Sequence, residues 1–97
     1  MTRYVVTYDI ADPKRLYRVF RTIRRYGDHL QLSVFECRLD DRELLRLQDR
    51  LRKIISPGDD QILFIRLGPA GRSASEDATI TALGLPYHAR DLSVTVY

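Results

Sequence analysis

One stretch near the start of the chain, Tyr4 to Ile10, constrains the fold most strongly, because β-branched and aromatic residues follow one another until an acid ends the run. In a strand, Asp9 would lie on the face opposite the tyrosines. Burying an ionised carboxylate without a partner is costly, so such an acid usually caps a helix, pairs with a cation or holds a metal. Asp12, directly before Pro13, is the better helix cap. Asp9 is therefore left with either a structural or a functional role.

The length of 97 residues suits a single domain, residues 1–97, with one hydrophobic core. We find no apolar run long enough to cross a bilayer and no secretory signal pattern, so we expect a cytoplasmic protein without membrane contact. Cys37 lies in an apolar strand pattern and is expected to be a buried, unreactive thiol. Cys37, His29 and His88 do not have the spacing of a zinc site.

A first helix is expected from Pro13 to Tyr26, with Gly27 as its C-terminal cap. Its core-facing stripe would consist of Leu16, Val19, Phe20 and Ile23. The charged residues on its other side are all cations, namely Lys14, Arg15, Arg18, Arg21, Arg24 and Arg25. Most charge runs are solvated faces, but the lack of compensating acids favours a surface that binds phosphate.

The middle of the chain predicts a second strand at residues 30–39, a second helix after Asp40, and a third strand at residues 61–67. Asp40 and Glu43 have the spacing of a capping box. The buried stripe of this helix would be Leu44, Leu47, Leu51, Ile54 and Ile55. Both strands carry apolar residues on both faces, and one layer of helices covers only one face of a sheet. We therefore expect a second subunit to cover the other face.

The last third of the chain begins with residues 68–77, whose composition predicts a flexible loop. Residues 78–83 alternate threonine with apolar residues, as in a fourth strand. Residues 92–97 alternate in the same way, with no turn after them, so we expect this segment to pair with the sheet of a second copy.

Two element orders remain open. The predicted segments, taken as they stand, give strand, helix, strand, helix, strand, strand. A ferredoxin-like sheet would need an additional hairpin partner between residues 30 and 40. Periodicity alone does not choose between them.

Four motifs together resemble the small CRISPR-associated adaptation protein family, the non-integrase subunit of the spacer-acquisition complex. They are YVVTYDI at 4–10, DPKR at 12–15, YG at 26–27 and QLSVFEC at 31–37. The resemblance implies an α+β fold with a ferredoxin-like sheet and two helices on one face. It also implies a tight homodimer in which the C-terminal strand, residues 92–97, adds to the partner's sheet.

The resemblance further implies that Asp9 is the catalytic residue and metal ligand, and that it meets the partner's Asp9 across a two-fold axis. It places Tyr8, Ser33 and Phe35 in the cleft between chains and the cations Lys14, Arg15 and Arg18 near phosphates. Mg²⁺ is the expected cation, with Mn²⁺ as an alternative, because hard divalent cations prefer oxygen ligands. One carboxylate is too few for a strong site, so the symmetric pair is the minimum.

Members of this family are described as magnesium-dependent endonucleases on RNA or double-stranded DNA, and as non-catalytic bridges that hold integrase dimers on DNA. We expect double-stranded DNA, single-stranded RNA and the CRISPR integrase as partners. One alternative is a toxin-type endoribonuclease resembling virulence-associated protein D, against which the motif at 33–37 argues. Another is a ferredoxin-like regulatory module that binds a metabolite, against which the cationic helix argues.

Overall fold

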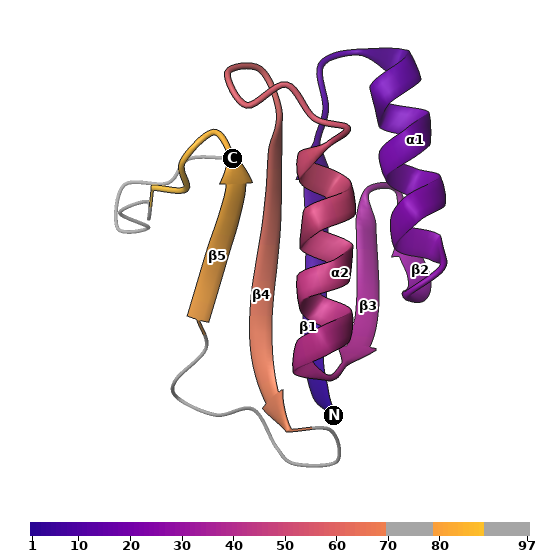
Figure 1. The fold of residues 1–97 in the computed structure, drawn as a ribbon, viewed down its shortest axis with the longest axis vertical. Helices are drawn as coiled ribbons and strands as arrows, with labels where there is room; N and C mark the ends of the chain where they lie inside the picture. Colours follow the sequence, from indigo (N-terminus) through magenta and orange to yellow (C-terminus); the bar gives the residue numbers. More distant parts are fainter. Residues whose placement is uncertain (70–78, 89–97) are drawn as a thin grey trace, which may run out of the picture.

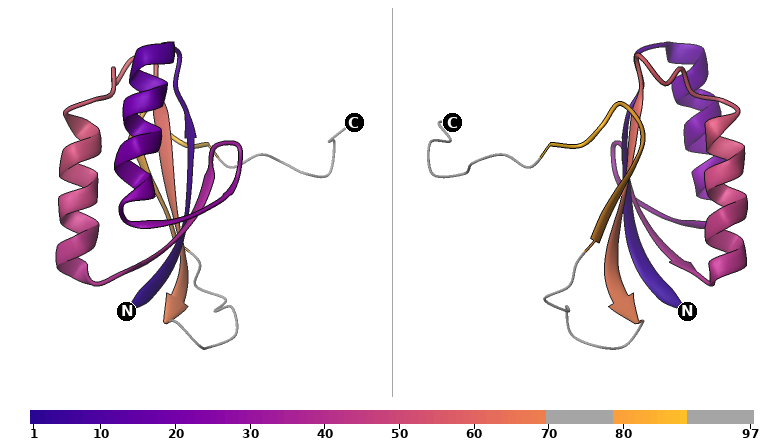
Figure 2. Two further views of the ribbon diagram at one scale, coloured as in Figure 1. Left: turned by 90° about the vertical axis from the view of Figure 1, so that its right-hand side faces the viewer. Right: turned by 60° about the vertical axis from the view of Figure 1, so that its left-hand side comes forward.

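The structure is a computed structural model, and it describes residues 1–69 and 79–88. The elements in chain order are β1 (Thr2–Asp9), α1 (Pro13–Arg24), β2 (Gly27–Gln31), β3 (Val34–Leu39), α2 (Asp41–Arg52), β4 (Gln61–Pro69) and β5 (Thr79–Gly84). The strands form one antiparallel sheet in the order β2-β3-β1-β4-β5 (Figure 1). Both helices lie on the same face of this sheet (Figure 2). The predicted α+β, ferredoxin-like arrangement is confirmed, with β5 as an additional edge strand.

Strand β1 lies in the centre of the sheet, between β3 and β4. Its tyrosine face points toward the helices, where Tyr4, Val6 and Tyr8 are buried. Phe35 of β3 and Phe64 of β4 flank this row and are almost fully enclosed. The remaining core is apolar side chains from the two helices and neighbouring strands, including Val19, Ile23, Leu47, Leu51, Ile62 and Leu83. The alternation of β1 therefore directs its odd-numbered residues, Asp9 included, to the opposite face.

The single strand predicted at residues 30–39 is wrong, because the chain forms a β2–β3 hairpin there. Residues 32 and 33 make the turn, and Leu32 has a φ of 32°, a left-handed conformation that side chains rarely adopt. The His29 ring donates from Nε2 to the Leu32 carbonyl oxygen and holds this turn. The turn contains neither glycine nor asparagine, the residues that usually indicate a hairpin turn. The alternation of polar and apolar residues at 30–39 therefore predicted one continuous strand. The hairpin supplies the strand that the ferredoxin-like order requires.

The first helix ends at Arg24, two residues before the predicted end, and Gly27 is not its cap. Gly27 instead opens β2, opposite Cys37. A Cβ at this position would collide with the Glu36 carbonyl oxygen and the Cys37 sulfur. The glycine is therefore required for the close approach of β2 to β3 rather than for ending the helix.

Helix α2 begins as predicted. The Asp40 carboxylate accepts from the Glu43 backbone N–H at 2.8 Å, and Glu43 Oε1 accepts from the Asp40 N–H at 3.1 Å, which completes the capping box. Leu47 and Leu51 are fully buried and Ile55 nearly so. The helix is thus fixed at its start by the cap and along its length by its apolar stripe.

The face of the sheet opposite the helices is open in the single chain. Val5, Thr7, Leu63 and Ile65 share this face through their pairing in β1 and β4, and each remains partly exposed. Ile80 of the edge strand is 38% exposed on the same side. In one chain Ile62 and Phe64 of β4 are enclosed while Leu63 and Ile65 are not, so burial of β4 on both faces depends on the expected second subunit and stays a prediction.

Three predictions concern the segments beyond β4. Gly68 and Pro69 belong to β4, so the predicted loop begins too early, and residues 70–77 of it lie outside the described residues. The predicted fourth strand corresponds to β5, Thr79–Gly84. The predicted exchanged strand, residues 92–97, also lies outside the described residues. None of the helices described is both long and apolar enough to cross a membrane.

Candidate nucleic-acid and metal site

Asp9 stands at the C-terminal end of the central strand, where it is exposed. Asp12 takes the capping role as predicted: its Oδ2 accepts from the Arg15 backbone N–H at 2.9 Å. The Asp9 carboxylate makes no hydrogen bond or ion pair with any residue of the described ranges. A charged group that the fold holds in a fixed place but does not use for its own stability is available for a ligand.

A hollow of about 530 Å³ lies beside Asp9, between the first turns of α1 and the β2–β3 turn. It brings together three of the predicted site residues, Tyr8, Asp9 and Ser33. The Tyr8 backbone N–H donates to the Ser33 carbonyl oxygen at 3.2 Å, which fixes the hairpin turn next to the end of β1. Burial raises the pKa of the Tyr8 phenol, which therefore stays protonated at neutral pH.

Phe35 does not line the hollow, and its side chain is fully buried in the core. Its ring lies 6.2 Å from Tyr8, 5.6 Å from Phe20 and 4.8 Å from His29, measured between ring centroids. Tyr8 and Phe20 of this aromatic cluster line the hollow, and Phe35 packs against both of them. Phe35 thus contributes to the site through packing rather than contact.

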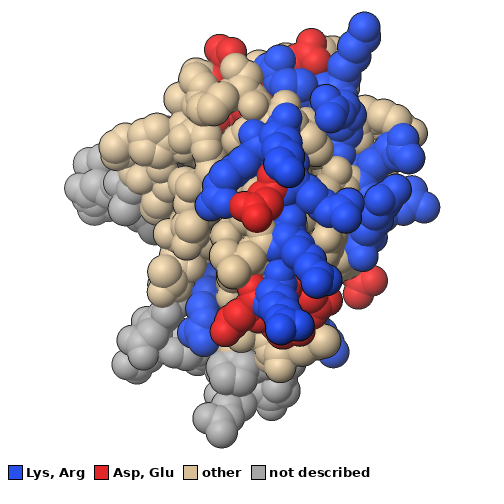
Figure 3. Space-filling model, in the orientation of Figure 1, with Lys and Arg blue, Asp and Glu red and all other residues tan. Residues whose placement is uncertain are grey.

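Exposed cations follow α1 away from the hollow, among them Lys14 and Arg18. Lysines and arginines gather over the helical face of the molecule (Figure 3). A second hollow, of about 180 Å³, is lined by Arg18, Arg21, Thr22, Arg25 and Ile54. Arginine binds phosphate through two parallel hydrogen bonds, so three arginines around one depression form a suitable anion site.

Arg15, the third cation predicted to contact phosphate, is engaged inside the protein instead. Its Nε donates to Asp60 Oδ2 at 2.8 Å and its Nη2 to Asp60 Oδ1 at 3.2 Å. This pairing raises the pKa of Arg15. A guanidinium held by a buried carboxylate is poorly placed to serve a ligand as well. We therefore give Arg15 a structural role and retain Lys14 and Arg18 as phosphate candidates.

Asp60 is the residue of this region that the sequence analysis missed. Its side chain is fully buried and also accepts from the backbone N–H groups of Ala11 at 2.9 Å and Ser56 at 2.8 Å. The hydrogen bond from Arg15, followed by those from the backbone, lowers the pKa of Asp60 to about 2. Because Ala11 is two residues beyond Asp9, Asp60 holds the loop that carries the candidate acid. The one sequence signal for this buried acid is the pair of aspartates, residues 59–60, directly before an apolar strand.

A metal site cannot be completed by one chain as far as the structure describes it. In residues 1–69 and 79–88 no three His, Cys, Asp or Glu side chains are grouped so that they could hold an ion. The exposed Asp9 carboxylate offers hard oxygen ligands suited to Mg²⁺ or Mn²⁺, but only from one residue. The donor chemistry fits a divalent cation, but one carboxylate is too few donors to hold it firmly.

We compared the chain with models of known protein families. The family model described as CRISPR associated protein Cas2 matches residues 1–74. The chain belongs to the Cas2 family. This membership bears out the resemblance drawn from the four motifs and sets aside the toxin-type and metabolite-binding alternatives.

Cas2 relatives match in both sequence and structure. The CRISPR-associated endoribonuclease Cas2 1 of Rhodospirillum rubrum is 44% identical over 81 residues, covering 84% of this chain and 76% of the relative. The CRISPR-associated endoribonuclease Cas2 of Geobacter sulfurreducens is 40% identical, covering 69% and 70%. The crystal structure of Streptococcus pyogenes Cas2 at pH 6.5 superposes with a TM-score of 0.60 at 37% identity, covering 64% of this chain and 81% of that one. In this chain the Cas2 fold places Asp9 beside the hollow and next to α1.

Proposed function

We propose that this Cas2-family chain acts in CRISPR adaptation as a homodimer that binds nucleic acid and hydrolyses phosphodiester bonds with a divalent cation. One observation supports this most strongly. An exposed carboxylate without a partner in the described chain, Asp9, borders a hollow beside a helix whose exposed cations include Lys14 and Arg18. A cationic surface attracts the phosphate backbone, and a carboxylate at its edge can hold the metal.

The open face of the sheet supports the homodimer. Its centre is apolar, with Val5, Leu63 and Ile65, while an ion pair at one end joins Arg3 Nη2 to Glu36 Oε2 at 3.6 Å. Asp9 lies at the opposite end of β1. Interfaces between subunits commonly have such an apolar centre and a polar rim. In this proposal a second copy covers the face and brings its own Asp9 close to the first.

The proposed metal is Mg²⁺, with Mn²⁺ as the alternative, held by Asp9 and the partner's Asp9. Such an ion, when bound, lowers the pKa of water and stabilises charge on phosphate oxygens. The chain itself contributes Asp9 as the ligand and Lys14 and Arg18 as phosphate contacts. Asp60 fixes the loop after Asp9 through the Ala11 N–H. Tyr8 and Ser33 border the space in which the scissile bond would lie.

The proposed partners are double-stranded DNA, single-stranded RNA and the CRISPR integrase subunit. The names of the relatives support ribonuclease activity, since both are termed endoribonucleases. The cationic helical face supports binding of a duplex, because double-stranded DNA carries a dense array of phosphate charges. A bridging role between integrase dimers would use this surface without requiring Asp9.

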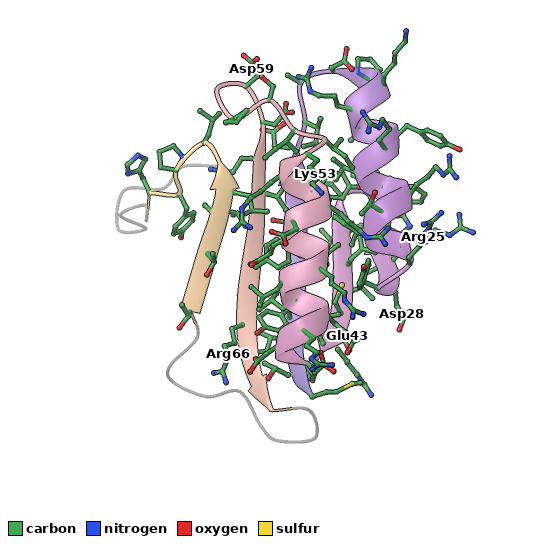
Figure 4. All side chains as sticks on the ribbon, viewed as in Figure 1. Arg25, Asp28, Glu43, Lys53, Asp59 and Arg66 are labelled. Carbon is green, nitrogen blue, oxygen red and sulfur yellow. The ribbon has the colours of Figure 1, made fainter. Side chains whose placement is uncertain are left out.

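The deciding experiment compares cleavage by wild type and Asp9→Asn, with Mg²⁺ and with chelator. The substitution keeps the shape of the side chain and removes its charge, so cleavage should be lost while DNA binding remains. Asp28→Asn is the matched control, because Asp28 is exposed on β2, near the lower end of α1 in Figure 4 and away from the end of β1 that carries Asp9. Cleavage that survives in Asp9→Asn, or that chelator does not affect, would refute the metal-dependent nuclease and leave the scaffold role.

A further inference from the structure

We propose that the hollow beside Asp9 binds one unpaired nucleobase of a single-stranded nucleic acid. The adjoining phosphodiester would then lie against the carboxylate. This inference rests on the proposed function and specifies the state of the substrate at the same site: a single strand, or a nucleotide turned out of a duplex, rather than a stacked base pair.

The size and lining of the hollow suit a flat organic ring. Its volume of about 530 Å³ falls within the roughly 300–1,000 Å³ of small-molecule sites. Leu16 and Tyr17 of α1 form one side and Leu32 of the hairpin turn the other. The polar side chains of Asp9 and Ser33 border the same space. A mostly apolar slot with few polar groups can hold the faces of a base and leave its edge for hydrogen bonds.

These apolar walls are exposed in the free chain. Leu16 is 40% exposed, Tyr17 61% and Leu32 85%. Exposed apolar side chains that line a single hollow indicate a binding surface more strongly than scattered ones. Leu32 is in addition held at positive φ, with its carbonyl bound by His29. Strained backbone of this kind is often found at ligand sites, where the surrounding structure maintains it.

The arginines of two neighbouring depressions, rather than the lining of the hollow itself, indicate that its occupant belongs to a polyanion. The Arg21 guanidinium lies 5.7 Å from the centroid of the Tyr17 ring. Tyr17 also lines a neighbouring depression of about 320 Å³ together with Phe20, Arg21, Arg24 and Arg25. Arg21 and Arg25 in turn line the arginine depression described above. The three hollows are therefore neighbours around α1, through shared residues.

A single nucleic-acid strand has both chemical groups that these three hollows can bind, a flat apolar ring and a phosphate. Its bases are apolar rings that stack on aromatic side chains, and its phosphates pair with arginine. In a duplex the bases are stacked on each other and only their edges are accessible, so a duplex could use the arginines but not the slot. Tyr17 is the residue that joins the two parts, because it lines both the hollow beside Asp9 and the depression of about 320 Å³.

The test measures binding by fluorescence anisotropy in chelator, so that no cleavage occurs. The probes are a labelled single-stranded oligonucleotide, the same strand with abasic residues, and the blunt duplex of the same sequence. Tyr17→Ala should weaken binding of the intact single strand by about 5- to 150-fold, the range found when a stacking side chain is removed. Binding of the abasic strand and of the duplex should not change. Tyr17→Phe should retain affinity, and Tyr87→Ala, an exposed tyrosine beyond β5, is the matched control.

Several outcomes would overturn the proposal. Equal weakening of single strand and duplex by Tyr17→Ala would show that only the charged surface matters. Abasic and intact strands binding equally to wild type would show that no base is held. A change from dimer to monomer in Tyr17→Ala would show that the hollow is an interface between copies. If duplex binding and Asp9-dependent cleavage persist in these cases, the proposed function stands; if wild type binds no nucleic acid, both fail.

Discussion

The Arg15 Nε atom lies 2.8 Å from Asp60 Oδ2, and this pair joins the first turn of α1 to the turn that precedes β4. The carboxylate is fully buried and receives four hydrogen bonds, from Arg15, Ala11 and Ser56. Because Ala11 closely follows Asp9, the ion pair maintains the position of the candidate acid without contacting a substrate.

The first prediction concerns the stability that Asp60 contributes. Asp60→Asn would place an amide against N–H donors and leave Arg15 without its counter-charge, so the free energy of unfolding at pH 7 should fall by about 3 kcal/mol. Urea denaturation followed by circular dichroism measures it. Asp59→Asn is the control, because Asp59 is exposed and its carboxylate accepts one hydrogen bond, from the Ser56 hydroxyl at 2.8 Å. Equal effects of the two substitutions would contradict the role given to Asp60.

The same carboxylate predicts a pH dependence. Its pKa is lowered from 3.8 to about 2 in the folded protein, so its stabilisation is complete above the unfolded-state pKa and is lost as the pH falls from about 4 to about 2. The stability difference between wild type and Asp60→Asn should therefore be constant from pH 7 to about 5 and shrink below about 4. Denaturation series at several pH values measure this difference. A difference that grows on acidification would be inconsistent with a lowered pKa.

The second prediction separates the two neighbouring arginines of α1. Arg18→Ala should weaken duplex DNA binding and reduce the log-log salt slope by roughly 0.9, because one phosphate contact is lost. Arg15→Ala should lower stability while leaving this slope unchanged, since its guanidinium is bound to Asp60. Titrations at several salt concentrations, together with unfolding curves, distinguish the two. A reduced slope in Arg15→Ala would restore Arg15 as a phosphate contact.

The third prediction concerns the open face of the sheet. Ile65→Asp should convert a dimer at micromolar concentration into a folded monomer, because a charge would enter the apolar centre of the interface while the core of the single chain stays intact. Multi-angle light scattering gives the mass and circular dichroism the fold. Leu45→Asp, at a position 59% exposed on α2, is the control and should remain dimeric. Deletion of residues 92–97 tests the exchanged strand separately: an unchanged dimer would argue against it.

The fourth prediction uses Cys37 as a reporter. Burial raises the pKa of its thiol to about 12, and the residue is fully enclosed between the sheet and the helices. The thiolate is the reactive form, so the native protein should react with a thiol reagent only as fast as it opens. The rate should rise with denaturant in parallel with unfolding. Rapid reaction in native buffer would show that this part of the core opens locally.

Much of the fold follows from local patterns in the sequence. The alternation in β1, the Asp12 and Asp40 caps and the stripe of α2 each rest on neighbouring residues, so sequence reasoning recovers them. The β2–β3 hairpin was missed because its turn uses Leu32 in a conformation that side chains rarely adopt. A turn of this kind leaves no signal in composition.

The candidate site was only partly predictable, for a different reason. Asp9 could be selected because it ends an apolar strand. The partner of Arg15 is 45 residues away in sequence, and only the folded chain shows that this arginine is engaged by Asp60. Phe35 was assigned to the cleft, yet the sheet register turns it into the core. Contacts between residues far apart in the sequence decide which side chains are free to bind a ligand. Local sequence patterns do not reveal these contacts.

The central position of β1 has a consequence for how the protein is made. The ribosome synthesises β1 before any of its neighbours, and β3 can pair with it once the hairpin has emerged. Its other edge has to wait for β4, where Asp9 lies opposite Gln61. Throughout that interval β1 presents an unpaired edge with an apolar side, the kind of surface that drives aggregation of nascent chains. The interval ends when β4 is added, which also brings Asp60 to Arg15 and completes the support of the loop after Asp9.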